Sequence, residues 1–276
     1  MLRSTYKLPR LFPYVGSKYS MIRYIVPLIP TCDVYVEVFG GSGAVLFAKP
    51  PFKREIFNDL NSDVVNFFRV LRDPEKSKEL IRLLELTPYS REEYEFCKHT
   101  LGSTQNDVEK AYKFFVVQNM CFKGLRDTWE SSLSRNQLGI FYRSVNELAL
   151  FSERLKSVYI EHSDFRKIFS MYDSENTFFF VDPPYLLENS DLNERMYSLS
   201  FSFADHLDLI NILLNIKGKA MLTSYPNEVH RTLEEHGWHK IEIRKKLKIS
   251  PGKEPVSECI WINYDFETSL WQTQTE

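Results

Sequence analysis

The tetrapeptide DPPY, residues 182–185, is the stretch whose residue types and spacing most directly suggest chemistry. It follows the apolar run TFFFV, so we expect Asp182 to stand at the carboxyl end of a buried strand, where ligands bind in α/β proteins. Pro183 and Pro184 have fixed φ angles and no backbone N–H, so they stop the strand and form a rigid loop of carbonyl acceptors. Tyr185 adds a flat aromatic face beside these acceptors.

Two oxygen acceptors held close together suit an amino group that carries two hydrogens. The exocyclic amine of adenine is such a group, and it is a poor nucleophile because its lone pair is delocalised into the ring. Accepting both hydrogen bonds helps to localise that lone pair, while an aromatic side chain can stack on the base. The base is buried in a duplex, so it must first be flipped out. The alternative is a proline-capped strand end, but four specified residues match by chance only about once per few hundred thousand positions.

A glycine-rich turn lies earlier in the chain, in the segment VEVFGGSGAVLFAK of residues 36–49. Gly40, Gly41 and Gly43 allow a tight turn and a close approach to a ligand. The first strand of a doubly wound sheet is where nucleotides bind, although an ordinary glycine turn has the same composition. A dinucleotide fingerprint would need glycine at position 46, where the chain has leucine, so that alternative is weakened.

Two carboxylates flank this turn. Glu37 lies in the preceding strand, where it would repel a pyrophosphate but would suit a cationic or amine-bearing ligand. Asp59 ends the next strand, in FNDLN, which is the usual place for a carboxylate that binds ribose hydroxyls. Together with the glycine turn, they fit an adenosine ligand with a charged amino-acid tail, namely S-adenosylmethionine.

Short apolar strands and helical patterns alternate along the chain. The sequence predicts seven strands, at residues 34–39, 54–58, 158–162, 177–182, 219–224, 238–247 and 258–264. Helical patterns occupy residues 18–29, 42–49, 61–72, 164–172, 204–216 and 226–237. This alternation predicts an α/β fold with a mostly parallel sheet. Because a short loop separates the last two strands, we expect them to form a hairpin and an antiparallel edge.

Residues 73–143 break this rhythm, since they show helices and polar loops but no convincing strand. The segment is far longer than a crossover between two strands needs. We therefore predict a catalytic domain formed by residues 1–72 and 144–276, with residues 73–143 as an inserted subdomain.

Composition and charge limit the class of protein. The chain has 276 residues and is 43% hydrophobic, which suits one large domain or a domain with an insert. The formal net charge of −2 gives no long-range attraction to nucleic acid, so local basic patches must provide it. Four scattered cysteines favour reduced thiols in the cytoplasm over a disulfide frame or a zinc site. We find no signal peptide and no apolar run long enough to span a membrane.

With these motifs identified, the chain resembles the Dam-type DNA adenine N6-methyltransferases, the D12 class of bacteria and phages, over nearly its whole length. YVGSK at 14–18 resembles the N-terminal element of that family, VEVFGGSG its cofactor loop and FNDLN its ribose-binding element. HSDF at 162–165 is similar to its short D-F element, and VDPPY to its catalytic motif. The order of cofactor loop, insert and catalytic motif is that of the α-group.

The stretch QNMCFKGLR at 118–126 also resembles a family element, N-x-x-x-F-x-G-x-x-R. Two features depart from the family pattern. Val38 stands where many members have proline, and an FNVP-G segment is missing after Arg126. These departures leave the expected fold and chemistry unchanged, but they leave the DNA recognition sequence open.

The resemblance implies a Rossmann-like, S-adenosylmethionine-dependent methyltransferase fold with seven strands, and a role for each motif residue. The catalytic residues would be Asp182, Pro183, Pro184 and Tyr185. The cofactor would be bound by Tyr14, Gly16, Lys18, Glu37, Phe39, Gly40, Gly41, Gly43, Asp59, Asp164, Phe165 and Asp182.

The DNA partner is expected to meet the insert. The stretch of residues 123–143 is rich in basic, hydroxyl and amide side chains, which can contact phosphates, although the same composition suits a solvated face. The expected DNA-binding residues are Asn119, Lys123, Arg126 and Arg135. His206 resembles a family position near a helix start, and we expect a structural or capping role for it.

The leading hypothesis is transfer of a methyl group from S-adenosylmethionine to N6 of a flipped adenine in double-stranded DNA, without a metal. Adenine in RNA is the near alternative. Cytosine N4 methylases usually show S-P-P-Y and protein-glutamine methylases N-P-P-Y, so Asp182 favours adenine. A non-catalytic nucleic-acid-binding relic is the alternative of a different class, and the intact DPPY motif and Asp59 argue against it. The sequence leaves open the oligomeric state and any part in restriction-modification.

Overall fold

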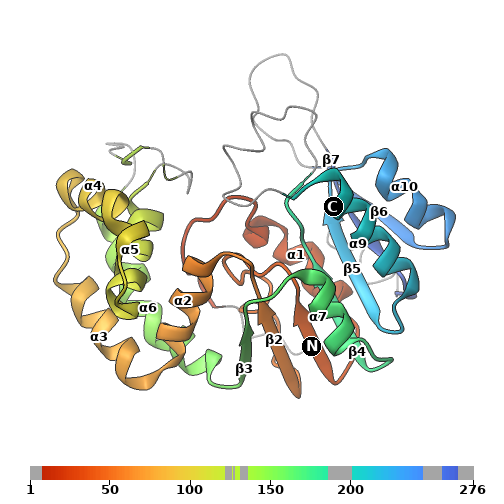
Figure 1. The fold of residues 1–276 in the computed structure, drawn as a ribbon, viewed down its shortest axis with the longest axis horizontal. Helices are drawn as coiled ribbons and strands as arrows, with labels where there is room; N and C mark the ends of the chain where they lie inside the picture. The colour runs from red at the N-terminus through yellow and green to blue at the C-terminus, as the bar shows by residue number, and fades with distance from the viewer. Residues whose placement is uncertain are drawn as a thin grey trace, which may run out of the picture. The chain divides into compact units, whose positions relative to one another are not determined.

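The computed structural model describes residues 8–121, 126, 128–130, 136–185, 201–244 and 257–266. The chain divides into two compact units (Figure 1). The helical unit comprises residues 1–23, 40–51 and 59–162, and the sheet unit comprises residues 24–39, 52–58 and 163–276. The glycine turn therefore belongs to the helical unit, and DPPY belongs to the sheet unit.

The described residues form a seven-stranded sheet of order β3-β2-β1-β4-β5-β7-β6, which confirms the predicted number of strands. β1 pairs in parallel with β2 and with β4, and β4 pairs in parallel with β5. β7 runs antiparallel to both β5 and β6, which confirms the expected antiparallel edge. The strands are β1 (Val34–Glu37), β2 (Arg54–Asn58), β3 (Val158–Glu161), β4 (Thr177–Val181), β5 (Lys219–Ser224), β6 (His239–Arg244) and β7 (Ser257–Ile262).

Strand order reverses around β1 and β4 in the sheet unit, which is the arrangement in which α/β proteins bind ligands at the carboxyl edge. All five residues of β4 are buried, as a strand covered on both faces requires. Glu37 at the end of β1 is level with Phe180, two residues before Asp182. The carboxyl ends of these two strands therefore bring the two predicted carboxylates to the same edge of the sheet.

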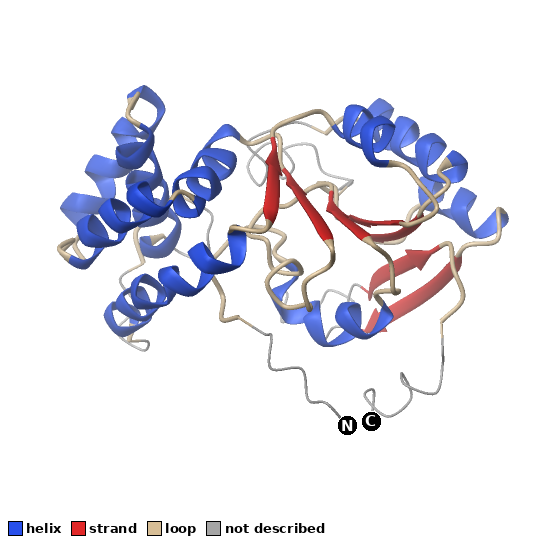
Figure 2. Cartoon of the chain, turned by 90° about the horizontal axis from the view of Figure 1, so that it is seen from below, coloured by secondary structure: helices blue, strands red, loops and turns tan. Residues whose placement is uncertain are grey.

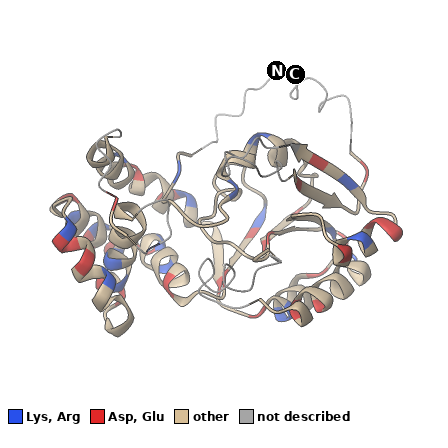
Figure 3. Ribbon diagram, turned by 90° about the horizontal axis from the view of Figure 1, so that it is seen from above, with Lys and Arg blue, Asp and Glu red and all other residues tan. Residues whose placement is uncertain are grey.

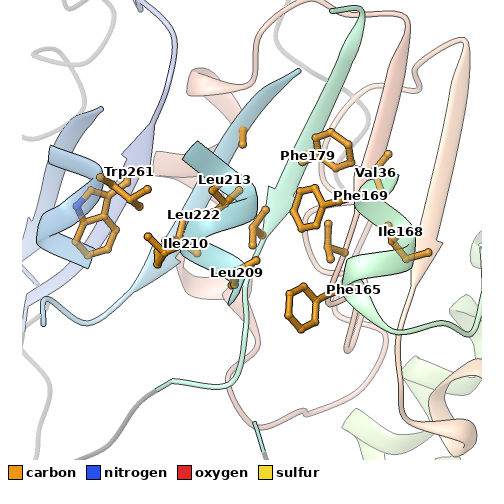
Figure 4. Packing of buried hydrophobic residues seen from close by; sticks show 14 of the residues in the cluster. Val36, Phe165, Ile168, Phe169, Phe179, Leu209, Ile210, Leu213, Leu222 and Trp261 are labelled. Atoms are coloured by element: carbon orange, nitrogen blue, oxygen red, sulfur yellow. The ribbon is translucent and has the colours of Figure 1, made fainter. Parts of the chain in front are cut away.

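Three helices of the sheet unit, α7 (Phe165–Tyr172), α9 (Phe203–Asn215) and α10 (Glu228–Glu235), contribute to its core. Figure 4 shows Phe169 and Ile168 of α7 and Leu209 and Leu213 of α9 directed toward the strands. The ring centroids of Phe169 and Phe179 of β4 are 4.7 Å apart. Figure 2 shows helices on both sides of the strands of this unit. Burial of apolar surface stabilises the folded state by about 25 cal/mol per Å² removed from water. This packing holds the strands, and with them the carboxyl edge of the sheet, in place.

The helical unit contains α2 (Ser62–Arg72), α3 (Pro74–Glu85), α4 (Arg91–Thr100), η3 (Leu101–Ser103), α5 (Asp107–Met120) and α6 (Gln137–Leu155). Each of these α-helices begins at an N-cap side chain that accepts a backbone N–H; for α2 it is Asn61 and for α5 it is Asn106. Phe12 lies edge-on to Phe67 and Phe114 and gives the unit an aromatic core. Figure 3 shows acidic and basic residues interspersed along its helices.

The described part of residues 73–143 contains helices and no named strand, apart from an isolated bridge between Cys121 and Trp129. Helix α6 runs through position 143, where the predicted insert ends. The proposed boundary thus lies within a helix, and the compact helical unit continues to residue 162.

Two helical predictions differ from the structure. Residues 18–28 form three short pieces, η1 (Lys18–Met21), α1 (Ile22–Ile25) and η2 (Val26–Leu28), because Pro27 lacks the N–H that a continuous helix needs. Residues 42–49 form turns rather than a helix. Gly43 has φ +65°, and Pro50 and Pro51 follow at once, so too few residues remain to build stable helical turns.

Candidate active site

Asp182 follows β4 directly, and its carboxylate is held by the neighbouring strand. Val181 of β4 is level with Leu222 of β5, so Asp182 and Thr223 come side by side where these parallel strands end. The Thr223 hydroxyl donates a 2.8 Å hydrogen bond to Oδ1 of Asp182. Thr223 is fully buried, and its hydrogen bond restrains the position of Oδ1 of the carboxylate. The edge position predicted for Asp182 is where the structure places it.

Tyr185 is held on its far side by β7. Its hydroxyl donates a 2.7 Å hydrogen bond to Oε1 of Glu258, and only 8% of Tyr185 and 7% of Glu258 are exposed. The ring of Tyr225 lies edge-on to that of Tyr185, with centroids 4.8 Å apart and planes at 72°. Burial, together with the nearby carboxylates of Asp182 and Glu258, raises the pKa of Tyr185 well above its ordinary value. The phenol is therefore a hydrogen-bond donor at all ordinary pH values.

Two buried histidines lie close to the backbone around this loop. The imidazole of His206, on α9, lies near the backbone of Pro184, and Nδ1 of His230, on α10, lies 3.2 Å from the carbonyl oxygen of Tyr225. Burial lowers the pKa of both histidines to about 4, so both rings are neutral at pH 7. His206 is 1% exposed, which agrees with the predicted structural role.

The glycine turn is closed by Asp59 within the helical unit. Oδ2 of Asp59 accepts the backbone N–H of Gly41 at 2.7 Å, and Oδ1 accepts the backbone N–H of Asn61 at 2.8 Å. Burial raises the pKa of Asp59, while these two N–H groups act to lower it. A carboxylate has about four acceptor positions, so the same group can still accept hydroxyl donors.

Tyr14 packs against the turn. Gly41 has φ +51°, and a Cβ atom added there would lie 3.0 Å from the Tyr14 ring. Ser17 and Ser42 are hydrogen-bonded through their hydroxyls at 2.9 Å. Residues 14–18 and the glycine turn, far apart in the sequence, are thus in contact, as expected if both belong to one site.

Lys18 is buried rather than solvated, because it is 4% exposed, and its Nζ donates to the carbonyl oxygen of Gly16 at 2.9 Å. Lys18 is therefore not an ordinary solvated lysine. Gly40 contributes a carbonyl oxygen that accepts the N–H of Gly43 at 2.8 Å and closes the turn. A buried ammonium group next to a tight glycine turn is suited to an anionic group.

The remaining predicted cofactor residues lie in the sheet unit. Glu37 is 1% exposed, and its Oε2 accepts the hydroxyl of Tyr35 at 2.7 Å. Phe39, Phe165 and Phe201 form an aromatic cluster with ring centroids 5.4 to 5.8 Å apart. Such a cluster provides apolar ring faces of the kind that a nucleobase packs against.

Asp164 is the N-cap of α7, and it also meets Arg166 through a 3.1 Å contact. Arg166 further contacts Asp205 and Asp208 of α9, each at 2.6 Å, and its guanidinium lies 4.3 Å from the centre of the Phe165 ring. These contacts fix Asp164 and Phe165 relative to each other at the start of α7.

The four predicted DNA-binding residues differ in their surroundings. Asn119 is 9% exposed and its amide donates to the carbonyl oxygen of Phe115 within α5, so this side chain is built into the helix. Arg126 has φ 58°, lies with its guanidinium 5.0 Å from the centre of the Phe114 ring, and is 3.8 Å from Asp63 with its side chain 26% exposed. Lys123 and Arg135 lie outside the described residues.

Sequence reasoning missed Thr223, Glu258 and the contact of His206 with Pro184. Thr223 and Glu258 lie in LTSY and ECIWIN, segments assigned only to strands, and a polar residue near the end of an apolar strand was the available signal. Over the described ranges the structure has no group of three or more metal-ligating side chains placed to hold an ion. No helix in those ranges is long and apolar enough to cross a bilayer.

Comparison with known proteins agrees with these motifs. Residues 14–247 match the family described as D12 class N6 adenine-specific DNA methyltransferase. The type II methyltransferase M1.LlaDCHI of Lactococcus lactis subsp. cremoris is 26% identical over 91% of this chain and 94% of its own length. The type II methyltransferase M.CviBI of Paramecium bursaria Chlorella virus NC1A is 23% identical over 84% and 88%, and the DNA adenine methylase of Salmonella typhimurium is 23% identical over 87% of each chain. The chain therefore belongs to the D12 class of N6 adenine-specific DNA methyltransferases.

Proposed function

We propose that this DNA adenine methyltransferase takes its methyl group from S-adenosylmethionine and acts at specific sites, on an adenine flipped out of duplex DNA. The observation that carries the proposal is the fixed carboxylate of Asp182 next to two prolines at the carboxyl edge of the sheet. In this proposal Asp182 and a proline carbonyl of the motif accept the two hydrogens of the adenine amine. The ring of Tyr185 stacks on the base.

The chemistry that this arrangement supports is a direct transfer. The amine nitrogen forms a bond to the methyl carbon as the bond from that carbon to the sulfonium sulfur breaks, and one proton leaves the amine. Acceptors for the amine hydrogens favour this step because they localise the nitrogen lone pair and stabilise the positive charge that develops on nitrogen. The prolines hold the acceptors in place, so little reorganisation accompanies the reaction.

The residues of the glycine turn and its surroundings fit S-adenosylmethionine. In this proposal Asp59 accepts ribose hydroxyls and Lys18 binds the carboxylate of the amino-acid tail. The support is that Asp59 accepts the N–H of Gly41, that Lys18 is buried, and that a Cβ atom at Gly41 would lie only 3.0 Å from the Tyr14 ring. The assignments of Gly16, Glu37, Phe39, Gly40, Gly43, Asp164 and Phe165 follow by match to the family motifs. When bound, S-adenosylmethionine would supply an electrophilic methyl group on a sulfonium.

We assign DNA recognition to residues 73–143. The support is their helical, strand-free character in the described part and the basic composition of the stretch after residue 122. Arg126, whose side chain is partly exposed, is the described residue that we expect to reach DNA. Asn119 is better explained as a structural residue of α5 than as a direct DNA contact.

A methylation assay with labelled S-adenosylmethionine tests the proposal directly. Purified protein is incubated with duplex DNA, single-stranded DNA and RNA of the same sequence, and the modified nucleoside is identified by mass spectrometry. We expect N6-methyladenine in duplex DNA at a defined subset of adenines. N4-methylcytosine as the product, or transfer to RNA alone, would contradict it.

A further inference from the structure

Glu258 lies outside every motif that led to the active site, yet it contacts the catalytic loop. It is the second residue of β7, the strand that runs antiparallel to β5. The parallel strands end at the carboxyl edge, and an antiparallel strand in the same sheet begins there. Ser224, the last residue of β5, is level with Cys259, so Glu258 is brought to the edge where the DPPY loop begins.

A buried carboxylate needs compensation, because moving its charge out of water is costly unless it is hydrogen-bonded. Glu258 is 7% exposed, and the hydrogen bond from Tyr185 at 2.7 Å is in the range of charge-assisted bonds. An apolar residue would suit this position in the sheet better than a glutamate. Glu258 instead contacts Tyr185, a side chain of the proposed catalytic motif.

The contact restricts how the Tyr185 ring can turn. The hydroxyl is fixed at one end by Glu258, the ring centroid lies 4.8 Å from that of Tyr225, and the backbone before it is stiffened by Pro183 and Pro184. A stacking platform must present one face in a set orientation before the base arrives, since ordering it afterwards would cost free energy of binding.

We infer that Glu258 is a positioning residue that holds the Tyr185 ring in the orientation needed to stack on the flipped adenine. This inference rests on the proposed catalytic role of the DPPY loop. Glu258 does not touch the base; it acts through the phenol of Tyr185. The raised pKa of Tyr185 agrees with this, because the phenol remains a donor throughout the working pH range.

The test is a double-mutant cycle with Glu258→Ala, Tyr185→Phe and both together, each assayed for kcat and KM on duplex DNA. A charge-assisted hydrogen bond is worth about 1.5–3 kcal/mol, so each single variant should lose about 10- to 100-fold in kcat/KM. The double variant should lose no more than the larger single effect, because both changes remove the same contact. Glu258→Gln keeps an acceptor oxygen and should recover part of the Glu258→Ala loss.

The state of the flipped base can be measured directly, and a merely structural role of Glu258 would leave it unchanged. With 2-aminopurine at the target position, the fluorescence of the saturated complex should change in Glu258→Ala and in Tyr185→Phe in the same way. The affinity for S-adenosylmethionine should stay at the level of the parent protein. Glu242→Gln, at an exposed position on the adjacent β6, is the matched control and should behave like the parent protein.

Multiplicative losses in the double variant, or unchanged kcat/KM in Glu258→Ala, would overturn the inference. A lower Tm with unchanged fluorescence per folded molecule would overturn it as well, because the role would then be structural. The variant Tyr185→Ala distinguishes failure of the Glu258 inference from failure of the proposed function. If Tyr185→Ala is fully active, the proposed stacking role is wrong, whereas loss of activity there with a normal Glu258→Ala contradicts only the role of Glu258.

Discussion

The hydroxyl of Thr223 donates a 2.8 Å hydrogen bond to Oδ1 of Asp182, although the two residues are 41 positions apart. The bond joins the ends of β4 and β5, the two central parallel strands whose register places these residues side by side. The carboxylate of Asp182, proposed to be catalytic, is thereby tied to a buried strand. Its orientation depends on the packing of the sheet and not on the loop alone.

Replacing Asp182 by alanine should abolish methyl transfer while leaving the affinity for S-adenosylmethionine nearly unchanged. The reason is that Asp182 is proposed to meet the adenine amine. Asp182→Asn keeps an acceptor oxygen but loses the charge, so we expect reduced but measurable transfer. Tritiated-methyl transfer to DNA, with calorimetric titration of the cofactor for each variant, distinguishes the two effects. Full activity in Asp182→Ala would show that the catalytic assignment is wrong.

Thr223→Val should reduce kcat by about two- to tenfold, with little change in KM for DNA. Valine has nearly the same shape but leaves Oδ1 of Asp182 without its donor, and a lost hydrogen bond of about 0.5–1.5 kcal/mol corresponds to this order of effect. Thr223→Ser retains the hydroxyl and serves as the control in steady-state assays. Equal activities of the valine and serine variants would mean that the hydroxyl does not orient Asp182.

S-adenosylmethionine should raise the Tm of the protein by mass action, and NAD should not. Asp59→Ala should remove most of this stabilisation, because the carboxylate both closes the glycine turn through Gly41 and is proposed to bind the ribose. Differential scanning fluorimetry with increasing concentrations of S-adenosylmethionine or NAD measures the change in Tm. The variant without ligand provides the baseline, since loss of the bonds to Gly41 and Asn61 should also lower its own Tm. Stabilisation by NAD alone would contradict the cofactor assignment.

Arg126→Ala should weaken binding to duplex DNA or relax the sequence preference, by about 1–3 kcal/mol if it makes a bidentate base contact. Because its guanidinium also lies over Phe114, a modest loss of stability should accompany the change. Arg135→Ala tests the same prediction at a second basic position. Electrophoretic mobility shifts and methylation maps give the two readouts. If both variants keep the parent affinity and map, residues 73–143 lose their support as the recognition region.

The stability of the protein should fall between about pH 6.5 and pH 4. His206 and His230 have folded pKa values of about 4 because burial disfavours their charged forms, whereas in the unfolded chain histidine titrates near 6.5. As the pH decreases through this window, the unfolded state binds protons first, so the free energy of unfolding decreases. Urea unfolding at pH 7.5, 6 and 5 measures the slope.

Two substitutions test the source of this pH dependence. His206→Gln removes one of the two buried titrations and should flatten the slope. His236→Gln, at the exposed C-cap of α10, should leave it unchanged. An equal slope in the parent and the His206 variant would show that other groups control acid sensitivity.

The sequence by itself determined the α/β alternation, the seven strands and the position of Asp182 at a strand end. These follow from short-range patterns, because an apolar run followed by two prolines fixes where a strand stops whatever surrounds it. The strand boundaries agree within a few residues for the same reason. Family membership also came from local motifs, which the match over residues 14–247 confirmed.

Local patterns did less well at two places, the segment of residues 42–49 and Lys18. Residues 42–49 have helical spacing, but Gly43 adopts a left-handed conformation and two prolines close the segment, so turns form instead. Lysine is usually a surface residue, yet Lys18 is buried beside Gly16. For Lys18 the outcome depends on neighbours that the local pattern does not contain, whereas Gly43 and the two prolines are themselves part of the local sequence.

Only the tertiary structure decided which side chains lie against the DPPY loop. Thr223, Glu258 and His206 are separated from the DPPY motif by tens of residues, and nothing in their own segments identifies a partner. The register between β4 and β5 brings Thr223 to Asp182, and the antiparallel direction of β7 brings Glu258 to Tyr185. Strand pairing depends on the burial of the whole sheet, and a buried polar side chain must find a hydrogen-bond partner there, so these contacts are fixed only when the sheet is complete.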